Sequence, residues 1–306
     1  MILCAGESLI DMVPEAGHYR PLAGGAVYNT AIALGRLGVP TGYFWPISRD
    51  SFGEQLLRPL AEANVDTAFC PRSDRLTTLA FVTLTGGEAR YSFYDEGSAG
   101  RMLAPEDLPQ DSAGISALFI GGISLVPDPC GGSIETLVER LDPQVPVMLD
   151  PNIRPFFIQD AASYRARLER LFARADIVKL SGDDLDWLMP GATFAEAAAS
   201  ILAKGAKLVL QTGGEKGATA HWQGEPLNAP ATRVEVADTI GAGDTFNAGV
   251  LAALHRAGAL TRNGIAKLDA DTLLAALILG TRAAAITVSR PGANPPWRQE
   301  LDALPA

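Results

Sequence analysis

Three small residues, Gly241, Ala242 and Gly243, stand directly before Asp244 and an apolar stretch with helical spacing that begins at Phe246. Small residues at the start of a helix leave several backbone N–H groups free to converge on an anion, and the helix dipole is positive there. A carboxylate one residue further along can take a proton from a hydroxyl group. An anion cradle beside a general base suits phosphoryl transfer. We therefore predict that Asp244 is a catalytic base and that the three small residues receive a phosphoryl group.

Other interpretations of this segment are weaker, although one stays open. In a plain glycine-rich turn, Asp244 would only cap the helix. A dinucleotide-binding motif needs GxGxxG, and Phe246 occupies its last glycine position. The chain contains no Gly-Lys dipeptide, which excludes a Walker-type P-loop.

Two separated segments resemble one known family. Residues 238–249, DTIGAGDTFNAG, resemble the C-terminal signature of the ribokinase-like (PfkB) carbohydrate kinases, and residues 23–38, AGGAVYNTAIALGRLG, resemble the N-terminal one. The similarity extends from Gly6 to Ala293. It implies one kinase domain over residues 1–306, with an α/β fold. In that fold a central, mostly parallel sheet has helices on both faces, and a small β-sheet lid comes from about 12–22 and 78–100.

Several residues have the chemistry of a sugar site. Asp11 follows the first strand, where a βα loop would place it at the carboxyl edge of the sheet. Two glycines let a ligand approach the backbone, and an asparagine at a helix start offers both donor and acceptor. Asp11 as a turn residue and Arg154 as a solvated surface residue stay as alternatives. Together with the resemblance, these features predict sugar contacts at Asp11, Gly24, Gly25, Asn29, Tyr94 and Arg154.

The resemblance also implies sites for ATP and metal ions. Ser181 and Asp184 replace the family's Asn and Glu in its Asn-x-x-Glu motif, so we expect Asp184 to bind Mg²⁺ through water. The nucleotide contacts implied are Lys179, Ser181, Thr212, Gly213, Gly214, Gly217 and Thr281. A monovalent cation, K⁺, is implied at Asp238, Ile240, Thr287, Arg290 and Gly292.

Composition limits the function classes. Of 306 residues, 47% are hydrophobic and 20% charged, with a net charge of −10 and no basic cluster, which disfavours nucleic acid and anionic membranes as partners. The uncharged apolar runs fall short of the ~20 residues of a membrane span, and no secretion signal is evident. Three widely spaced cysteines predict a reducing cytoplasm and no structural zinc. Three histidines lie outside any nucleophile motif, so acid–base chemistry falls to carboxylates.

Alternating patterns predict a parallel sheet covered on both faces. Residues 273–288 indicate a buried helix that runs into a strand. Residues 78–84 and 88–94 flank Gly86-Gly87 as a hairpin, with Tyr91, Phe93 and Asp95 on one face and Ser92 and Tyr94 on the other. This hairpin is either an ordinary sheet edge or, as the resemblance implies, a lid that pairs two subunits as a homodimer. The strands expected are 117–120, 147–149, 177–179 and 208–211, and the helices 133–141, 164–173 and 194–204.

The choice of sugar rests on local detail. Kinases of 2-keto-3-deoxygluconate carry an arginine near Asp95, and a carboxylate there disfavours an acidic sugar. The segments DPNIRP and GGAVYN look most like bacterial fructokinases. We therefore expect an ATP-dependent kinase that phosphorylates fructose at its primary O6. The alternatives are 2-keto-3-deoxygluconate kinase and ribokinase, followed by a sugar-binding sensor and an oxidoreductase.

Overall fold

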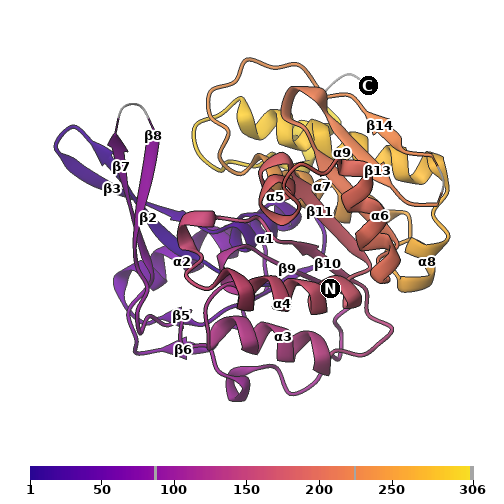
Figure 1. Ribbon diagram of the computed structural model, residues 1–306. Coiled ribbons are helices and arrows are strands. Elements are labelled where there is room, and N and C mark those ends of the chain that lie inside the picture. Colours follow the sequence, from indigo (N-terminus) through magenta and orange to yellow (C-terminus); the bar gives the residue numbers. More distant parts are fainter. Residues whose placement is uncertain (86–87, 224, 304–306) are drawn as a thin grey trace.

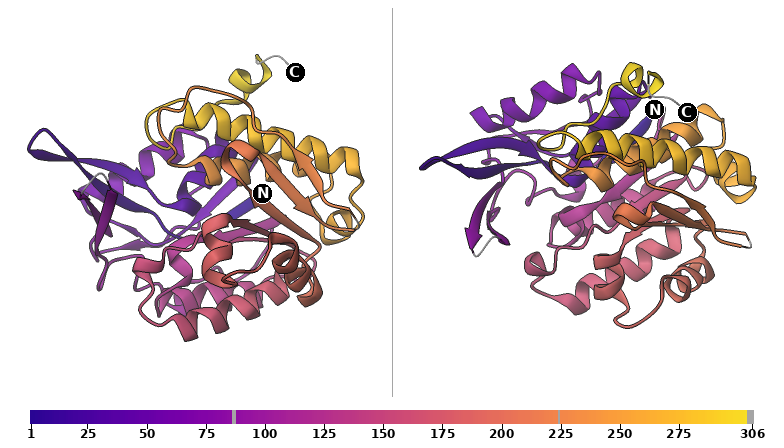
Figure 2. Two further views of the ribbon diagram at one scale, coloured as in Figure 1. Left: turned by 45° about the horizontal axis from the view of Figure 1, so that its top comes forward. Right: turned by 90° about the horizontal axis from the view of Figure 1, so that it is seen from above.

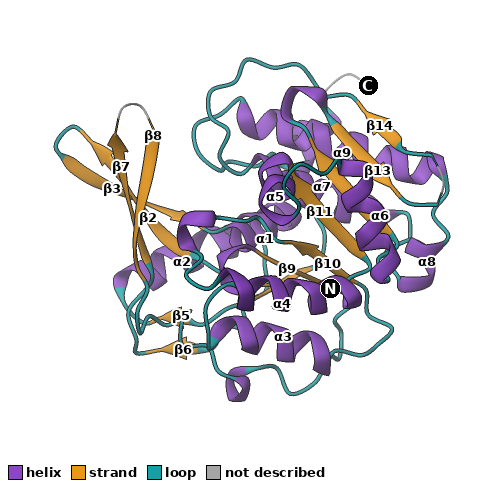
Figure 3. Cartoon of the chain, viewed as in Figure 1, coloured by secondary structure: helices purple, strands orange, loops and turns teal. Residues whose placement is uncertain are grey.

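A mostly parallel eight-stranded sheet forms the centre of the protein (Figures 1 and 3). The computed structural model describes residues 1–85, 88–223 and 225–303. The strand order is β14-β13-β12-β11-β10-β9-β1-β4. In this order the strands β12, β11, β10, β9, β1 and β4 run parallel to one another, and β13 and β14 add an antiparallel edge. The bounds are β1 (Ile2–Ala5), β4 (Thr41–Phe44), β9 (Ala117–Gly121), β10 (Val147–Asp150), β11 (Ile177–Ser181), β12 (Leu208–Thr212), β13 (Ala218–His221) and β14 (Leu227–Ala229).

Helices cover both faces of this sheet, which is why β1, β4, β9 and β10 are buried along their whole length. On one face lie α3 (Cys130–Arg140), α4 (Ala161–Arg174) and α6 (Phe194–Lys204), and on the other α1 (Ala26–Arg36), α7 (Ala242–Arg256) and α9 (Ala270–Val288) (Figures 1 and 2). The predicted α/β architecture is confirmed. The shorter helices are α2 (Ser51–Glu62), α5 (Gly182–Leu188), α8 (Arg262–Ala266) and α10 (Arg298–Asp302), with 3-10 turns η1 (Pro105–Asp107), η2 (Gly122–Leu125), η3 (Pro155–Phe157) and η4 (Gly214–Lys216).

A second sheet projects from the body, drawn in indigo and purple in Figure 1, and we call it the lid. Its order is β3 (His18–Gly24), β2 (Leu9–Glu15), β7 (Leu79–Thr85) and β8 (Glu88–Tyr94). Both strands of the predicted hairpin are present, whereas the turn at Gly86-Gly87 lies outside the described residues. A short pair, β5 (Ile47–Ser48) and β6 (Arg72–Ser73), lies near its base.

Two local predictions were wrong. Asp11 lies inside β2 rather than in a βα loop, because the chain after β1 enters the lid and pairs with β3 and β7. Residues 273–288 belong wholly to α9, and in the described residues no strand follows. The apolar run that suggested a strand is instead a helix buried against α7.

Helix α9 is, by length and hydropathy, the one helix in the described part of the chain that could cross a membrane. Asp271 and Arg282 lie within it, so its uncharged apolar run is shorter than the helix, as the sequence analysis expected. Half of its apolar window is buried inside the protein. A β-carbon at Gly249 of α7 would lie only 2.6 Å from the Gly280 Cα of α9, so the two helix backbones nearly touch. We interpret α9 as a core helix.

Candidate active site

The N-terminus of α7 is built to receive an anion. Its cap, Gly241, has φ 78°, and a β-carbon there would lie 2.8 Å from the Ala293 Cβ, so both conformation and space favour glycine. Ala242 N–H donates weakly to the Thr239 carbonyl, 3.4 Å away. In the described residues, the N–H groups of Gly243 and Asp244 have no hydrogen-bond partner. Two free donors therefore lie at the positive end of a helix dipole.

Asp244 lies in the first turn of α7 and is 7% exposed. Its Oδ2 accepts a hydrogen bond of 2.9 Å from Asn29 Nδ2. Burial raises the pKa of Asp244 to about 7, although the Asn29 hydrogen bond lowers it. The carboxylate thus contacts α1 instead of capping its own helix, and its pKa suits a general base at neutral pH.

Helix α1 carries the glycine-rich segment to this carboxylate. A β-carbon at Gly24 would lie 2.4 Å from Asp11 Oδ2, so the Asp11 carboxylate lies directly over Gly24. Gly25 caps α1 at φ 122°, a conformation that side chains rarely adopt. Burial raises the pKa of Asp11 to about 6. The structure therefore brings Asp11, Gly24, Gly25 and Asn29 toward Asp244.

Glu7 is a buried carboxylate that the sequence analysis did not single out. It is 5% exposed, and burial raises its pKa. Its Oε1 accepts from Ala26 N–H at 3.0 Å and its Oε2 from Ser124 N–H at 3.2 Å. Glu7 thereby ties the start of α1 to η2. The sequence did contain a signal for this residue, because Glu7 follows the buried strand β1 by only two residues. A glutamate so close to a buried strand is expected to need a hydrogen-bond partner within the protein.

Four rings join the lid to the body, and we call them the aromatic clasp. Tyr91 of β8 stacks on Phe156 of η3 with centroids 5.5 Å apart and an interplanar angle of 6°. Phe93 contacts Phe157 edge-on at 4.8 Å. The clasp adjoins Arg154 in the sequence, and the charge of Arg154 lowers the pKa of Asp244. Tyr91 and Phe93 share a face with Asp11, because Asp11 and Phe93 both pair with Ala80.

Tyr94 lies on the opposite face of the lid, because side chains alternate along a strand. Its ring contacts Phe81 edge-on at 5.3 Å, and Phe81 contacts Tyr19 at 5.0 Å. We call these three rings the outer aromatic patch. Tyr94 is 65% exposed, and the structure does not bring it to the other predicted sugar residues.

Asp95 is held by an ion pair. Arg101 Nη1 lies 3.2 Å from Asp95 Oδ2 and also donates through Nε to the Asp128 carbonyl. Arginine offsets the negative charge that was expected to repel an acidic sugar. The sequence argument against such a substrate is therefore weaker in the folded protein.

The predicted nucleotide residues lie along the carboxyl ends of β11 and β12. Ser181 and Thr212 are direct partners in register, and the loop after Thr212 closes with Gly213 N–H on the Gly217 carbonyl at 2.8 Å. Gly213 and Gly214 are exposed. Thr281 is placed differently, because it is buried in α9 and its hydroxyl donates to the Ile278 carbonyl of the same helix.

Lys179 lies next to the anion cradle. A β-carbon at Gly243 would be 3.3 Å from Lys179 Nζ. The ammonium is 3.0 Å from Asp150 Oδ2, which also accepts from Asn247 Nδ2 at 2.7 Å. Burial lowers the pKa of Lys179, but Asp150, Asp184 and Asp244 together more than offset this, so the pKa is raised. A buried positive charge thus supplements the free N–H groups of α7.

The predicted metal residues show two different arrangements. Asp184 is buried, and its oxygens accept from Ile153 N–H at 2.6 Å and from Ser181 N–H and Oγ at 2.7 and 2.6 Å. The described residues contain no group of three His, Cys, Asp or Glu side chains fit to hold a metal. Most of the acceptor capacity of Asp184 is therefore used to hold the start of α5 and the β10–η3 loop, and its predicted contact with Mg²⁺ through water stays a prediction.

Two of the residues predicted to bind a monovalent cation, Ile240 and Gly292, contact the predicted ligand Asp238. Its carboxylate accepts from Ile240 N–H at 3.0 Å and Gly292 N–H at 2.9 Å. Thr287 lies buried in the last turn of α9, with its hydroxyl 3.0 Å from Thr245 Oγ1. Arg290 pairs with Glu300. Asp238 thus joins the segment before α7 to the turn after α9.

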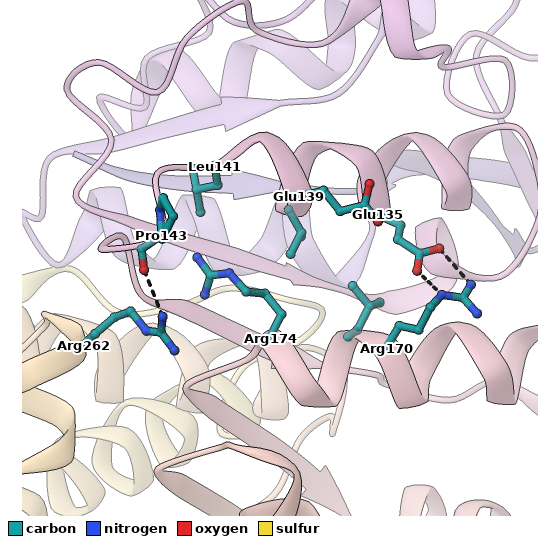
Figure 4. Close-up of a pocket in the computed structure, with 9 residues that line it drawn as sticks. Glu135, Glu139, Leu141, Pro143, Arg170, Arg174 and Arg262 are labelled. Atoms are coloured by element: carbon teal, nitrogen blue, oxygen red, sulfur yellow. Dashed lines mark hydrogen bonds and ion pairs between the residues drawn. The ribbon is translucent and has the colours of Figure 1, made fainter.

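A cavity of about 320 Å³ lies elsewhere, between α3, α4 and the start of α8 (Figure 4). Its arginines are committed to internal partners, since Arg170 pairs with Glu135, and Arg174 and Arg262 pair with the buried Asp176. Asp176 precedes β11, so this cavity lies at the amino ends of the strands. None of the predicted site residues lines it.

Comparisons with known proteins agree with this geometry. A family model described as pfkB family carbohydrate kinase matches residues 1–300. A fructokinase of Rhizobium leguminosarum bv. trifolii is 48% identical over 279 residues, covering 89% of this chain and 85% of that protein. A crystal structure of Xylella fastidiosa fructokinase with bound ATP has a TM-score of 0.91 at 29% identity, with coverage of 99% and 97%. A crystal structure of a Vibrio cholerae O395 fructokinase double mutant with bound fructose, ADP and potassium ion has a TM-score of 0.82 at 25% sequence identity. The match covers 95% of this chain and 93% of that one.

The fold and the family match together define a kinase that acts on carbohydrates. The chain belongs to the pfkB family of carbohydrate kinases. It is a sugar phosphotransferase, as the sequence analysis predicted.

Proposed function

We propose that this protein is a fructokinase that transfers the γ-phosphoryl group of ATP to the primary O6 of D-fructose. One observation carries the proposal: the Asp244 carboxylate and the free N–H groups of Gly243 and Asp244 lie at one helix start, joined to the glycine-rich segment by Asn29. The 48% identity to a fructokinase supports the choice of sugar. We further propose one kinase domain over residues 1–306, with the lid as its cover.

The proposed mechanism uses this chain's own groups. Asp11, Gly24, Gly25 and Asn29 hold the sugar, with Arg154 beside them, so that its O6 hydroxyl faces Asp244. Asp244 takes the hydroxyl proton while O6 forms a bond to the γ-phosphorus and the bond from that phosphorus to the β,γ-bridging oxygen breaks. The free N–H groups and the Lys179 ammonium stabilise the charge on the transferring group. ADP leaves with the bridging oxygen, and fructose 6-phosphate forms.

The nucleotide is proposed to lie along Ser181, Thr212 and the glycine loop to Gly217. Mg²⁺ would neutralise phosphate charge when bound, and we expect the phosphates and water to supply its direct ligands, with Asp184 contacting it only through water, because other hydrogen bonds already hold its oxygens. K⁺ would bind carbonyls near Asp238, Ile240, Thr287, Arg290 and Gly292. We place the enzyme in the cytoplasm, where its three buried free cysteines stay reduced.

A panel of neutral and acidic sugars, assayed for ADP formation with Mg·ATP, tests the function. We expect fructose to give the highest kcat/KM, and potassium to raise the rate above that in a bulky organic cation. A preference for 2-keto-3-deoxygluconate is the second candidate, favoured by the Arg101–Asp95 pair that offsets the acidic charge. Formation of no ADP with any sugar would remove the kinase proposal, and equal rates in both cations would remove the potassium site.

We also propose a homodimer formed through the outer face of the lid. Tyr19 and Tyr94 of the outer aromatic patch are 44% and 65% exposed, and such rings are typical of interfaces. Light scattering is expected to give twice the chain mass for the wild type and one chain mass for Tyr94→Arg. The matched variant Leu76→Arg, at another exposed apolar residue, should remain dimeric. A monomeric wild type at micromolar concentration would exclude this interface.

A further inference from the structure

Asn29 belongs to two structural groups at once. It lies in the first turn of α1, next to the glycine-rich segment that approaches the sugar. Its Nδ2 also donates to Asp244 Oδ2 at 2.9 Å. The next residue, Thr30, donates to the main-chain carbonyl of Asp244 at 3.2 Å. The sugar segment and the base are therefore joined by direct hydrogen bonds between two helix starts.

We propose that Asn29 is the positioning residue of the general base: its amide holds Asp244 Oδ2, so that Oδ1 is the oxygen left to take the sugar proton. This inference rests on the proposed kinase function. In the described residues Oδ1 has no hydrogen-bond partner, and the side chain keeps a small exposed fraction. The carboxylate is thus fixed at one oxygen and open at the other.

The same hydrogen bond favours the ionised form of Asp244. Burial and the nearby Asp150 raise the pKa of Asp244, whereas the Asn29 hydrogen bond, Lys179 and Arg154 lower it. An N–H donor binds a carboxylate more strongly than a carboxylic acid. Asn29 therefore keeps more of the enzyme ready to accept a proton at neutral pH, in addition to any contact it makes with sugar.

The direction in which the pH profile should shift follows from the ionisation of Asp244. The base must be ionised to act, so kcat/KM of the wild type should rise with pH through about 7, the pKa of Asp244. Removing the donor raises that pKa, so the acid limb of the pH profile moves to higher pH. A residue that only binds sugar would raise KM without moving this limb.

Asn29→Ala removes the donor, and Asn29→Leu removes it while keeping nearly the same shape. Both variants should move the acid limb upward by about one pH unit, since a hydrogen bond to a charged group has roughly that effect on a pKa. Asn263→Ala, at an exposed position in α8, is the matched control and should keep the wild-type limb.

A second readout does not need turnover. The infrared band of the Asp244 carboxyl, identified by subtracting Asp244→Asn, should titrate at higher pH in both Asn29 variants without substrate. If the limb and the carboxyl titration stay at their wild-type positions, Asn29 is not a positioning residue. If the wild type makes no ADP with any sugar, the kinase proposal fails, while the infrared titration still decides the role of Asn29.

Discussion

Asp244→Asn is expected to lower kcat by roughly 10²–10⁴ while the protein stays folded. The amide cannot take the proton of the attacking hydroxyl, whereas the backbone N–H groups that stabilise the phosphoryl group remain in place. Substrate affinity should therefore change much less than kcat. Initial rates of ADP formation at saturating sugar and ATP measure this effect.

The same variant should be at least as thermostable as the wild type above pH 7. Burial raises the pKa of Asp244 to about 7, compared with roughly 3.9 in an unfolded chain, so the folded protein binds this proton more tightly. Ionisation of the carboxyl therefore costs folding free energy as the pH rises between these values. Asparagine has no such cost.

Asp271→Asn, at an exposed position in α9, is the matched control and should keep wild-type kcat. Near wild-type turnover of Asp244→Asn would show that another group is the base. A large fall in both activity and melting temperature would instead indicate a structural role for the carboxylate.

Much of the fold could be predicted from the sequence, because apolar runs and helical spacing report burial directly. The predicted helix 194–204 matches α6, and the four predicted parallel strands begin where β9 to β12 begin and end one or two residues early. The error at Asp11 has a physical cause, since β2 resembles a loop-to-helix connection until its partners β3 and β7 are known. Strand pairing is not local information.

The candidate site residues could be named from the sequence, but their contacts could not. No local pattern indicates that Asn29 is hydrogen-bonded to Asp244, because 215 residues separate them. The orientation of Tyr94 follows from register with β7, and the neutralisation of Asp95 depends on Arg101 folding back across the base of the lid. Asp184 has the same charge as the glutamate of the usual motif, but only the structure shows that its carboxylate accepts hydrogen bonds from the backbone N–H groups of Ile153 and Ser181.

Lys179→Met should produce the largest loss of stability among these variants. It leaves Asp150, 1% exposed, without the cation that lies 3.0 Å from its Oδ2. Removing one partner of a buried ion pair costs about 3–5 kcal/mol, because the remaining charge is not compensated. Urea unfolding at neutral pH measures this loss. Lys204→Met, which removes a surface pair with Glu169, should cost less than about 1 kcal/mol.

The double variant Asp150→Asn/Lys179→Met separates stability from catalysis. With both charges removed, the buried site no longer holds an unpaired ion, so much of the unfolding free energy should return relative to either single variant. Its kcat should nevertheless stay low, because the ammonium next to Gly243 is absent from the anion cradle. Unfolding losses that simply add would contradict an energetic coupling between the two residues. Recovery of kcat together with stability would show that Lys179 acts only as the counter-ion of Asp150.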